Sequence, residues 1–426
     1  MSHFNNNFYK NNREKFVQFL DKKSIAIFFS ADVFPRNGDQ NFPFRQNSDL
    51  LYLSGIAQEE TILVLAPDAN RKVLKEILFI KEVSEVDVIW HGKKLSKKEA
   101  SDISGISTIY FVSQYDAVLH ELMSETSKVY LWQNEFPKYQ TEVEYKSLRE
   151  IKKLKEKYPL HQYDRSFALL EKLRLRKLPE EIEAISLAGK ISSDAFHRVL
   201  KNCNPGMMEY EVEADILYEF VKNNCKNPSF PTIVASGKNA CCLHYVDNNA
   251  RCTENELLLI DFGAEVFHYA ADCSRTIPVS GTFNVRQKEC YNAVLQVFKQ
   301  AKKLYKPGNT INKVNEEVNK MMNQVCIDLG LYSTMDVENS RDKDLFTKYY
   351  MHGAAHFIGL DVHDVGQKST LFEKGMVLSC EPGIYIPEEN IGIRIETDML
   401  VDENPVDLLE SIPVEVEEIE SLMKNL

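Results

Sequence analysis

Residues 257–276, LLLIDFGAEVFHYAADCSRT, decide the fold of the C-terminal half of the chain. Four apolar residues precede Asp261, which predicts a buried strand, and Gly263 just after it predicts the corner of a hairpin. A second extended segment reaches Asp272, so that two carboxylates would face each other across a two-stranded ribbon. Buried like charges are unfavourable unless a cation pairs with them, and a metal ion is the simplest cation. Two isolated aspartates would more often cap a turn and begin a loop, so the metal interpretation depends on later residues.

A second pair of acids lies in the last third of the chain. Glu381 occurs in VLSCEPGIYI and Glu396 in IGIRIETD. Isoleucines alternate with other residues over 391–395, which predicts a strand with the isoleucines on one face and Arg394, Glu396 and Asp398 on the other. The acids therefore come as two pairs, one in each part of the C-terminal region, which suggests a pseudo-symmetric core built from two similar units.

Histidines cluster between the two acid pairs, in MHGAAHFIGLDVHDVG. Three of the ten histidines, His352, His356 and His363, fall within these twelve positions. The first two are four residues apart, as zinc-binding histidines are on a helix, but the glutamate of HExxH is missing. Gly353 and Gly359 weaken a helix, so we expect a loop or an irregular strand. Each histidine alone could be a hydrogen-bonded structural residue. It is improbable, however, that none of these acids and histidines has a functional role.

The types of these residues indicate their chemistry. Two aspartates and two glutamates carry four negative charges, which balance two divalent cations, and one neutral histidine would complete the ligand set. Oxygen-rich ligation with a single imidazole favours Mn²⁺, with Co²⁺ and Zn²⁺ as alternatives. Two such ions can share a water molecule and lower its pKa toward neutrality. The sequence therefore predicts a hydrolase centre with two metal ions.

Composition excludes several other classes of protein. The chain has 426 residues, of which 44% are hydrophobic and 27% charged, as in a soluble globular protein. Its net charge is −12, with no basic patch interleaved with aromatics, so nucleic acid is not expected as a partner. Apolar runs are of strand length, and the polar N-terminus lacks a signal-peptide core, which predicts no membrane association and a cytoplasmic location. Nine irregularly spaced cysteines are expected to be reduced thiols.

The order of predicted elements indicates two domains. Strands and helices alternate to about residue 134, which predicts an α/β domain over 1–172, with closing helices expected at 142–158 and 164–175. A proline followed by two acids predicts a helix start at Pro179, continuing to about residue 200. Further helices are expected at 208–223, 286–305 and 311–329, and strands at 232–236, 257–276 and within 352–401. Helices with strands around them predict an α+β domain over 173–426.

At this point the chain resembles the pita-bread metallopeptidases, and among them the Xaa-Pro aminopeptidases, or aminopeptidase P. The similar blocks are TIVASGKNACCLHY, LLLIDFGAEVFHYAADCSRTIPVSG, HGAAHFIGLDVHDVG, EPGIYI and IGIRIETD, in the order and near the spacing of the family. FRQNSDLLYLSG and VIWHGKKL resemble the companion N-terminal domain of this family. The resemblance implies a C-terminal pita-bread catalytic domain preceded by a smaller N-terminal α/β domain of the creatinase and aminopeptidase P type.

The resemblance also implies roles for individual residues. It assigns Asp261 to one metal ion, His356 and Glu381 to the other, and Asp272 and Glu396 as bridges between them. The family pattern makes Glu381 a proton shuttle and places His363 and His244 against the substrate as catalytic residues. The remaining substrate-side positions are His352 lining the pocket, Arg394 holding carboxylates, and Tyr385 near the site.

The expected function is a dinuclear metallo-aminopeptidase that hydrolyses the N-terminal Xaa-Pro peptide bond by attack of a metal-bridging hydroxide, with peptides carrying proline in second position as substrates. Prolidase, which cleaves Xaa-Pro dipeptides, shares the fold and ligands and remains the alternative. Non-catalytic binding proteins of this fold and a metal-free hydrolase of the creatinase type are disfavoured because all five candidate ligands are present. The resemblance further implies a homo-oligomer, a dimer or a tetramer.

Overall fold

The computed structural model describes residues 4–136, 142–340 and 344–424. The chain divides into two compact units, Met1–Arg174 and Leu175–Leu426. The first is a mixed α/β unit and the second an α+β unit, each with its own hydrophobic core. All nine cysteines are free, as predicted. Among the described residues, no helix combines the length and the apolar character needed to cross a membrane.

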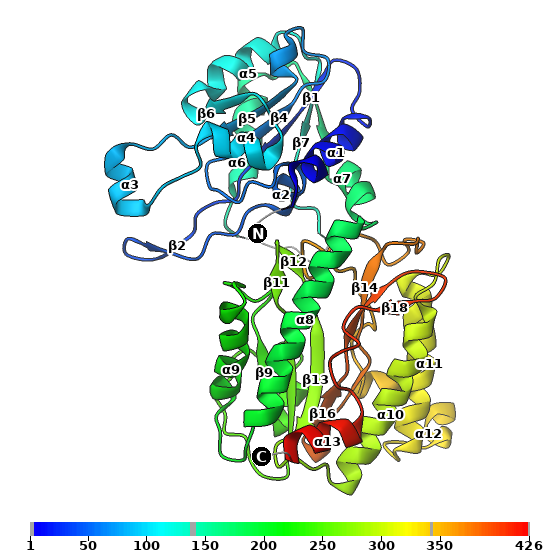
Figure 1. The fold of residues 1–426 in the computed structure, drawn as a ribbon. Coiled ribbons are helices and arrows are strands. Elements are labelled where there is room, and N and C mark those ends of the chain that lie inside the picture. Colours follow the sequence, from blue (N-terminus) through cyan, green and yellow to red (C-terminus); the bar gives the residue numbers. More distant parts are fainter. Residues whose placement is uncertain (1–3, 137–141, 341–343, 425–426) are drawn as a thin grey trace. The chain divides into compact units, whose positions relative to one another are not determined.

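The N-terminal unit is built around a six-stranded sheet with the strand order β6-β5-β4-β1-β7-β8 (Figure 1). Its strands are β1 (Ser24–Phe29), β4 (Ile62–Leu65), β5 (Glu76–Ile80), β6 (Ile109–Phe111), β7 (Lys128–Leu131) and β8 (Gln162–Arg165). Strand β4 runs antiparallel to both of its neighbours, and the other pairs are parallel. A short hairpin is formed by β2 (Pro35–Asn37) and β3 (Gln40–Asn41).

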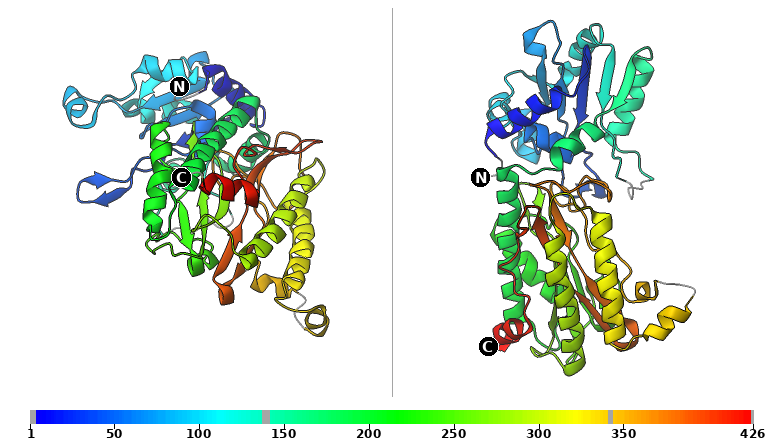
Figure 2. Two further views of the ribbon diagram at one scale, coloured as in Figure 1. Left: turned by 60° about the horizontal axis from the view of Figure 1, so that its bottom comes forward. Right: turned by 90° about the vertical axis from the view of Figure 1, so that its right-hand side faces the viewer.

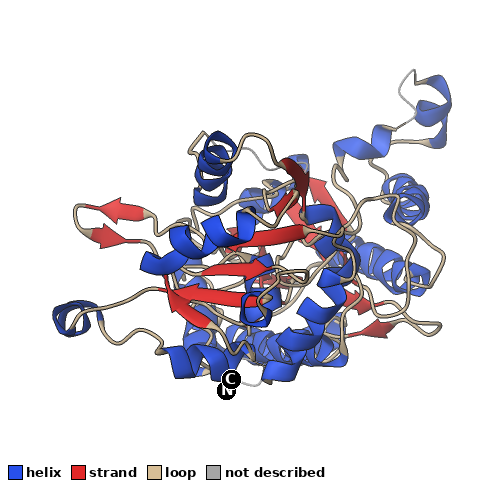
Figure 3. Ribbon diagram, turned by 90° about the horizontal axis from the view of Figure 1, so that it is seen from above, coloured by secondary structure: helices blue, strands red, loops and turns tan. Residues whose placement is uncertain are grey.

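Helices cover both faces of this sheet (Figure 3). They are α1 (Asn6–Val17), α2 (Ser48–Ser54), α4 (Lys97–Ser104), α5 (Tyr115–Met123), α6 (Lys146–Lys157) and α7 (Phe167–Arg174). The short helix α3 (Glu85–His91) has no buried residue and lies away from the sheet on a long loop (Figure 1). Side chains alternate across a strand, so consecutive residues of β1 reach opposite layers. Phe28 packs against Phe16 of α1 at a ring separation of 5.5 Å, while Phe29 packs against Tyr115 of α5 at 6.2 Å.

One predicted helix of this unit begins later than expected. The sequence predicted a helix over 164–175, but residues up to Arg165 form the edge strand β8, and α7 begins only at Phe167. The reason is tertiary, because β8 pairs in parallel with β7, and four residues of a polar edge strand carry little periodicity of their own. The helix predicted at 142–158 forms as α6.

The C-terminal unit consists of two similar halves (Figures 1 and 2). The first contains α8 (Pro179–Asn202), α9 (Glu209–Lys222), β9 (Ile233–Ser236), β10 (Leu257–Phe262) and β13 (Cys273–Pro278). The second contains the helices α10 (Val285–Ala301), α11 (Ile311–Asp328) and the short α12 (Thr334–Asn339). Its strands are β14 (Val377–Cys380), β15 (Gly383–Ile386), β16 (Ile391–Arg394), β17 (Thr397–Leu400) and β18 (Val406–Asp407), and α13 (Val416–Lys424) follows them. Each half is thus a helix pair followed by strands, which matches the expected pseudo-symmetry and the pita-bread fold.

The strands of the two halves meet in the middle of this unit. Three sheets have the orders β13-β10-β9, β14-β17-β18 and β15-β16, and β16 contacts both β10 and β13. The helix pairs lie outside the strands, with α9 against β9 and α10 against β15 and β16. The acid pair of each half is therefore carried to a common seam between the strands.

The hairpin that follows Asp261 differs from the prediction in where it turns. Strands β10 and β13 pair in antiparallel register, but the chain between them forms a second small ladder of β11 (Glu265–Val266) and β12 (Tyr269–Ala270). The tight turn falls at Phe267 and His268, whose φ angles are 51° and 70°. Gly263 instead allows the two strands' backbones to approach each other closely, because a Cβ there would lie 1.8 Å from the carbonyl oxygen of Ala271.

The strand predicted over 391–398 is interrupted. Residues 391–394 form β16 and pair with β15, whereas β17 starts at Thr397 and pairs with β14, so the chain changes sheets at Ile395 and Glu396. The predicted alternation nevertheless holds around Arg394 and Glu396, both of which face the seam. Residues 351–376 contain neither helix nor strand, as expected from their glycines.

Candidate metal centre

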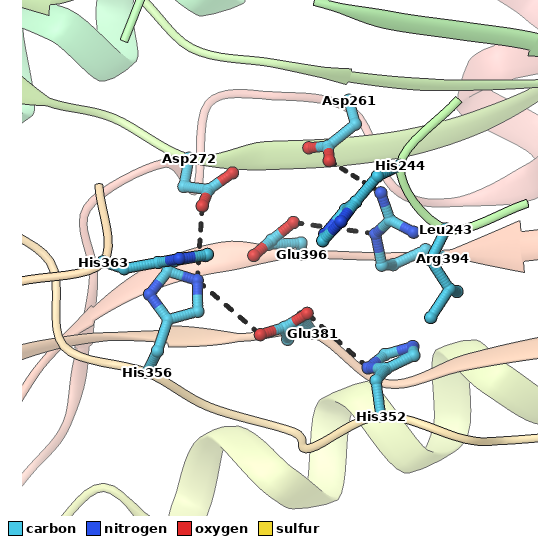
Figure 4. Close-up of a pocket in the computed structure, with 10 residues that line it drawn as sticks. All are labelled: Leu243, His244, Asp261, Asp272, His352, His356, His363, Glu381, Arg394 and Glu396. Carbon is cyan, nitrogen blue, oxygen red and sulfur yellow. Dashed lines mark hydrogen bonds and ion pairs between the residues drawn. The ribbon is translucent and has the colours of Figure 1, made fainter. Parts of the chain in front are cut away.

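A pocket opens at the seam between the two halves, and all the predicted ligands line it (Figure 4). Its lining residues are Leu243, His244, Asp261, Asp272, His352, His356, His363, Glu381, Arg394 and Glu396. They come from the end of β10, the residue before β13, the irregular segments 243–244 and 352–363, the residue after β14, the end of β16, and the link between β16 and β17. Tyr385, on β15, does not line the pocket and lies fully buried behind it.

The first half supplies Asp261 and Asp272. Asp261 pairs in register with Ser274, and Asp272 stands just beyond the Phe262–Cys273 pair, so both carboxylates reach the same side of the ribbon as predicted. The Ser274 hydroxyl lies 3.0 Å from Asp261 Oδ1 and 2.7 Å from Glu396 Oε2. Since a hydroxyl has one proton, it can donate to only one of these carboxylates at a time. Ser274 thus links the acids of the two halves.

Arg394 is the buried cation beside these acids. Its Nη2 donates to Asp261 Oδ2 at 2.7 Å, its Nε to Ser274 Oγ at 2.6 Å, and its Nη1 to the Tyr385 hydroxyl at 3.0 Å. The same Nε lies 3.9 Å from Glu396 Oε2. Only 4% of this arginine is exposed, and the acids around it raise the pKa of its guanidinium despite burial. Three directed hydrogen bonds therefore fix the orientation of Arg394, and one of them holds the Asp261 carboxylate.

His356 stands opposite, between acids from both halves. Its Nε2 lies 3.4 Å from Asp272 Oδ2 and 3.7 Å from Glu381 Oε1. Burial disfavours the protonated ring, but these two carboxylates outweigh it and raise the pKa of His356 to about 9. The nitrogen, together with oxygens of Asp272 and Glu396, forms a group whose ligand atoms all lie within 4.8 Å of one another.

Glu381 lies between two histidines. Its Oε2 is 3.6 Å from His352 Nδ1, while its Oε1 faces His356 and accepts a hydrogen bond from Ser379 Oγ at 3.3 Å. Burial is the main cause that raises the pKa of Glu381 to about 7, and the neighbouring acids add to it. A carboxyl group that titrates near neutrality can both release and accept a proton at working pH.

The acids of the pocket, when ionised, carry more negative charge than the nearby arginine and histidine can balance. Burial and the charge of Asp272 raise the pKa of Asp261 to about 6 even beside Arg394. Burial and the neighbouring carboxylates also raise the pKa values of Glu396 and Asp398 well above their usual range. Four buried carboxylates with one arginine and one histidine are a donor set that fits divalent cations, because such ions would remove this charge excess.

The other histidines border the pocket. His352 accepts or donates a hydrogen bond with the Tyr385 hydroxyl at 2.8 Å through its Nε2, and burial and the charge of Arg394 lower its pKa to about 3. The ring of His363 packs at 4.4 Å and 76° against that of His356. His244 is exposed and lies over the acids on the side of Arg394, across the pocket from His363 (Figure 4). His352 is therefore a neutral ring, while His363 and His244 face the open part of the pocket.

Several residues at the site were missed from the sequence. Ser274 joins the acid pairs, Ser379 hydrogen-bonds both Glu381 and the backbone of His356, and Leu243 lines the pocket. The two serines could have been found, because each is a polar residue in a strand that is otherwise buried on both faces. Leu243 carries no such signal.

Comparisons with known proteins agree with this geometry. Residues 183–403 match the model of metallopeptidase family M24, and residues 9–131 match that of the aminopeptidase P N-terminal domain. Xaa-Pro aminopeptidase of Escherichia coli strain K12 is 34% identical over 441 residues, covering 99% of each chain. Xaa-Pro aminopeptidase of Haemophilus influenzae is 34% identical over 421 residues, covering 95% of this chain and 94% of that one. A solved structure of zinc-substituted E. coli aminopeptidase P in complex with product matches with a TM-score of 0.89 at 32% identity, covering 99% of this chain and 98% of that one.

The chain belongs to metallopeptidase family M24. Within that family, its second matched domain and its relatives make it a metallo-aminopeptidase of the aminopeptidase P type, which confirms the resemblance drawn from the sequence motifs. Membership also implies divalent metal ions, and the four acids and the imidazole at the seam fit them.

Proposed function

We propose that this enzyme hydrolyses the peptide bond between an N-terminal residue and a following proline, using two divalent cations held by five side chains. The observation that carries the proposal is the convergence of two aspartates, two glutamates and a histidine on one buried pocket. Full-length similarity to proteins named Xaa-Pro aminopeptidase supports the choice of substrate.

The ligand assignment follows the pattern inferred from the sequence. Asp261 would hold one cation, His356 and Glu381 the other, and Asp272 and Glu396 would bridge the two. The mutual approach of ligand atoms from Asp272, His356 and Glu396 supports this arrangement. Mn²⁺ is the proposed ion, and Co²⁺ or Zn²⁺ would also suit these ligands. When bound, the cations would act as Lewis acids and would lower the pKa of a water molecule, which would supply the nucleophile for hydrolysis.

The protein's own groups would handle protons and hold the substrate. Glu381, which faces both His352 and His356 in the pocket, is proposed to take the proton of the attacking water and deliver it to the leaving nitrogen. A proline nitrogen carries no hydrogen in the peptide, so it must be protonated as it leaves. His363 and His244 are proposed to contact the substrate around the scissile bond, with His363 donating to the developing oxyanion. His352, neutral at working pH, would line the pocket beside them.

Prolidase activity is the competing function within the family. The two activities differ in whether the pocket accepts a chain beyond proline, and the full-length match of both domains to proteins named Xaa-Pro aminopeptidase favours the aminopeptidase. A non-catalytic binding protein is disfavoured because all five candidate ligands are retained in one pocket. Assembly into a dimer or tetramer stays a prediction, which sedimentation analysis can test.

A comparison of three peptides tests the substrate. The enzyme is loaded with Mn²⁺, Co²⁺ or Zn²⁺, and kcat/KM is measured for Xaa-Pro-Ala, Xaa-Ala-Ala and the dipeptide Xaa-Pro. We expect cleavage of Xaa-Pro-Ala to exceed that of Xaa-Ala-Ala strongly. Equal cleavage of both tripeptides would refute the preference for proline, and cleavage confined to the dipeptide would identify a prolidase.

Matched substitutions separate the proposed ligands from the proposed substrate contacts. Asp272→Asn and Glu396→Gln keep the side-chain shape but remove charge, so both should lower the metal content measured by elemental analysis. His363→Ala and His244→Ala should leave the metal content near normal while reducing turnover. An empty site in His363→Ala would show that this histidine is needed for metal binding and not for the substrate alone.

A further inference from the structure

The segment that carries His244 has little regular structure of its own. Residues 236–250 connect β9 to the region before β10 and contain only the short 3₁₀ helix Gly237–Cys241. Leu243 and His244 nevertheless line the pocket at defined positions (Figure 4). An irregular segment needs contacts from outside to hold a side chain at a reaction centre.

One buried carboxylate supplies four of these contacts. Glu209, the first residue of α9, is 0% exposed and accepts four hydrogen bonds from this segment. Its Oε1 accepts from the backbone N–H of Ser236 at 2.7 Å and from Asn239 Nδ2 at 3.1 Å. Its Oε2 accepts from the Tyr245 hydroxyl at 2.7 Å and from the backbone N–H of Ala250 at 2.8 Å. The backbone N–H of Glu209 also donates to the Ala250 carbonyl at 2.9 Å.

The distribution of the donors shows what Glu209 restrains. Ser236 and Ala250 stand at the two ends of the segment, and Tyr245 directly follows His244. All four donors are neutral, so the carboxylate acts through directed hydrogen bonds and not through an ion pair. Its position in the first turn of α9 favours its negative charge, because the unpaired N–H groups of a helix point out of that end.

We propose that Glu209 is a positioning residue that fixes the segment 236–250 so that His244 is held over the acidic cluster. It touches neither metal ligand nor substrate, and it acts through the hydroxyl of Tyr245 and both ends of the segment. The proposal rests on the substrate contact proposed above for His244. It adds to that function a buried acid, Glu209, whose role is to hold the segment 236–250 in place.

Glu209→Gln is the decisive substitution. A glutamine has a single acceptor oxygen, so in either orientation its NH₂ group faces two donors that have lost their partner. Glu181→Gln is the matched control, because Glu181 is 1% exposed and also accepts from a tyrosine hydroxyl, that of Tyr269 at 2.8 Å, and from a backbone N–H, that of Leu178 at 2.8 Å. Both variants replace a buried carboxyl group that accepts from a tyrosine hydroxyl and a backbone N–H, but only Glu209 binds the segment that carries His244.

Hydrogen exchange measures the positioning directly. In the metal-loaded enzyme, amides within 236–250 should exchange at least about tenfold faster in Glu209→Gln than in the parent, since buried donors left without an acceptor weaken the local structure. The same amides should be unchanged in Glu181→Gln. Unchanged exchange in Glu209→Gln would overturn the proposal, whatever the activity of His244 variants turns out to be.

A double-mutant cycle tests the connection to catalysis. Glu209→Gln should lower kcat/KM roughly 10- to 100-fold with normal metal content, as misplacement of a reacting group does. In a His244→Ala background the same substitution should change kcat/KM by less than about twofold, because the residue it positions is gone. An equal fall in both backgrounds would overturn the positioning role. Full activity of His244→Ala would refute the role proposed for His244 itself, and the exchange result would still decide whether Glu209 orders the segment.

Discussion

Removal of metal should make the stability of this enzyme depend on pH in a defined direction. In the metal-free protein, Asp272 and Glu381 hold a proton on His356 and raise its pKa from the ordinary 6.5 to about 9. A group whose pKa is higher in the folded than in the unfolded state contributes its full stabilisation at pH values below its pKa in the unfolded state. That stabilisation is lost as the pH rises toward the folded pKa.

The magnitude follows from the two pKa values. The difference between 6.5 and about 9 corresponds to about 3 kcal/mol of unfolding free energy, lost between pH 6.5 and 9. In a unit of this size that equals roughly 6 °C in Tm. The raised pKa values of Glu396 and Asp398 act in the same direction. His352, whose pKa is lowered to about 3, acts oppositely but only below pH 6.5.

Thermal unfolding of chelator-treated and metal-loaded enzyme over pH 6.5–8.5 tests this reasoning. The metal-free Tm should fall with rising pH, whereas the loaded Tm should stay level or rise, because a cation replaces the proton and binds deprotonated ligands. His356→Gln should remove the part of the metal-free slope that the His356 proton contributes and leave the part that the raised pKa values of the acids contribute. His363→Gln, which alters the adjacent ring at 4.4 Å, should keep it. A level metal-free Tm, or an unchanged slope in His356→Gln, would refute the assignment of the proton to His356.

Three further substitutions probe the supports of the site. In Arg394→Lys the ammonium group cannot keep the three directed hydrogen bonds of the guanidinium, so metal affinity measured by calorimetry should fall about 10- to 100-fold. An unchanged affinity would argue against an orienting role for Arg394. Lys177→Met removes a buried cation whose Nζ lies 2.9 Å from Asp364 Oδ2, and should cost about 3–5 kcal/mol in urea unfolding; a loss below about 1 kcal/mol would argue against a stabilising role for this ion pair. Gly263→Ala should destabilise the enzyme by at least about 3 kcal/mol, because its Cβ would meet the Ala271 carbonyl, and a normal Tm would require the hairpin to move.

The site was more predictable than the turns and supports around it. Acid type, strand alternation and histidine clustering are local signals, and they singled out the four acids and a cluster of three histidines. The choice of His356 among those histidines came from the family resemblance. All five residues, Asp261, Asp272, His356, Glu381 and Glu396, line one pocket. The corner of the hairpin was misplaced, because a glycine was read as a turn when its true constraint is the approach of a distant carbonyl.

Residues that act through distant contacts could not be inferred from sequence. Glu209 looks like an ordinary acid in the first turn of a helix, and only the fold places the segment 236–250 on its carboxylate. Edge strand β8 was read as part of a helix for the same reason, since only pairing with β7 makes it a strand. Such residues become recognisable when elements far apart in the chain are brought together.

The division of the acids between the two halves has a consequence for biosynthesis. Asp261 and Asp272 belong to strands that emerge from the ribosome long before Glu381 and Glu396 are translated, and nascent chains fold from their N-terminal parts first. Until the second half arrives, the first half holds two acids without Arg394, the cation that neutralises one of them. With the ligands proposed above, metal capture would have to wait for the nearly finished chain, and a truncated product lacking residues beyond 380 would leave the ribosome without Glu381 and Glu396.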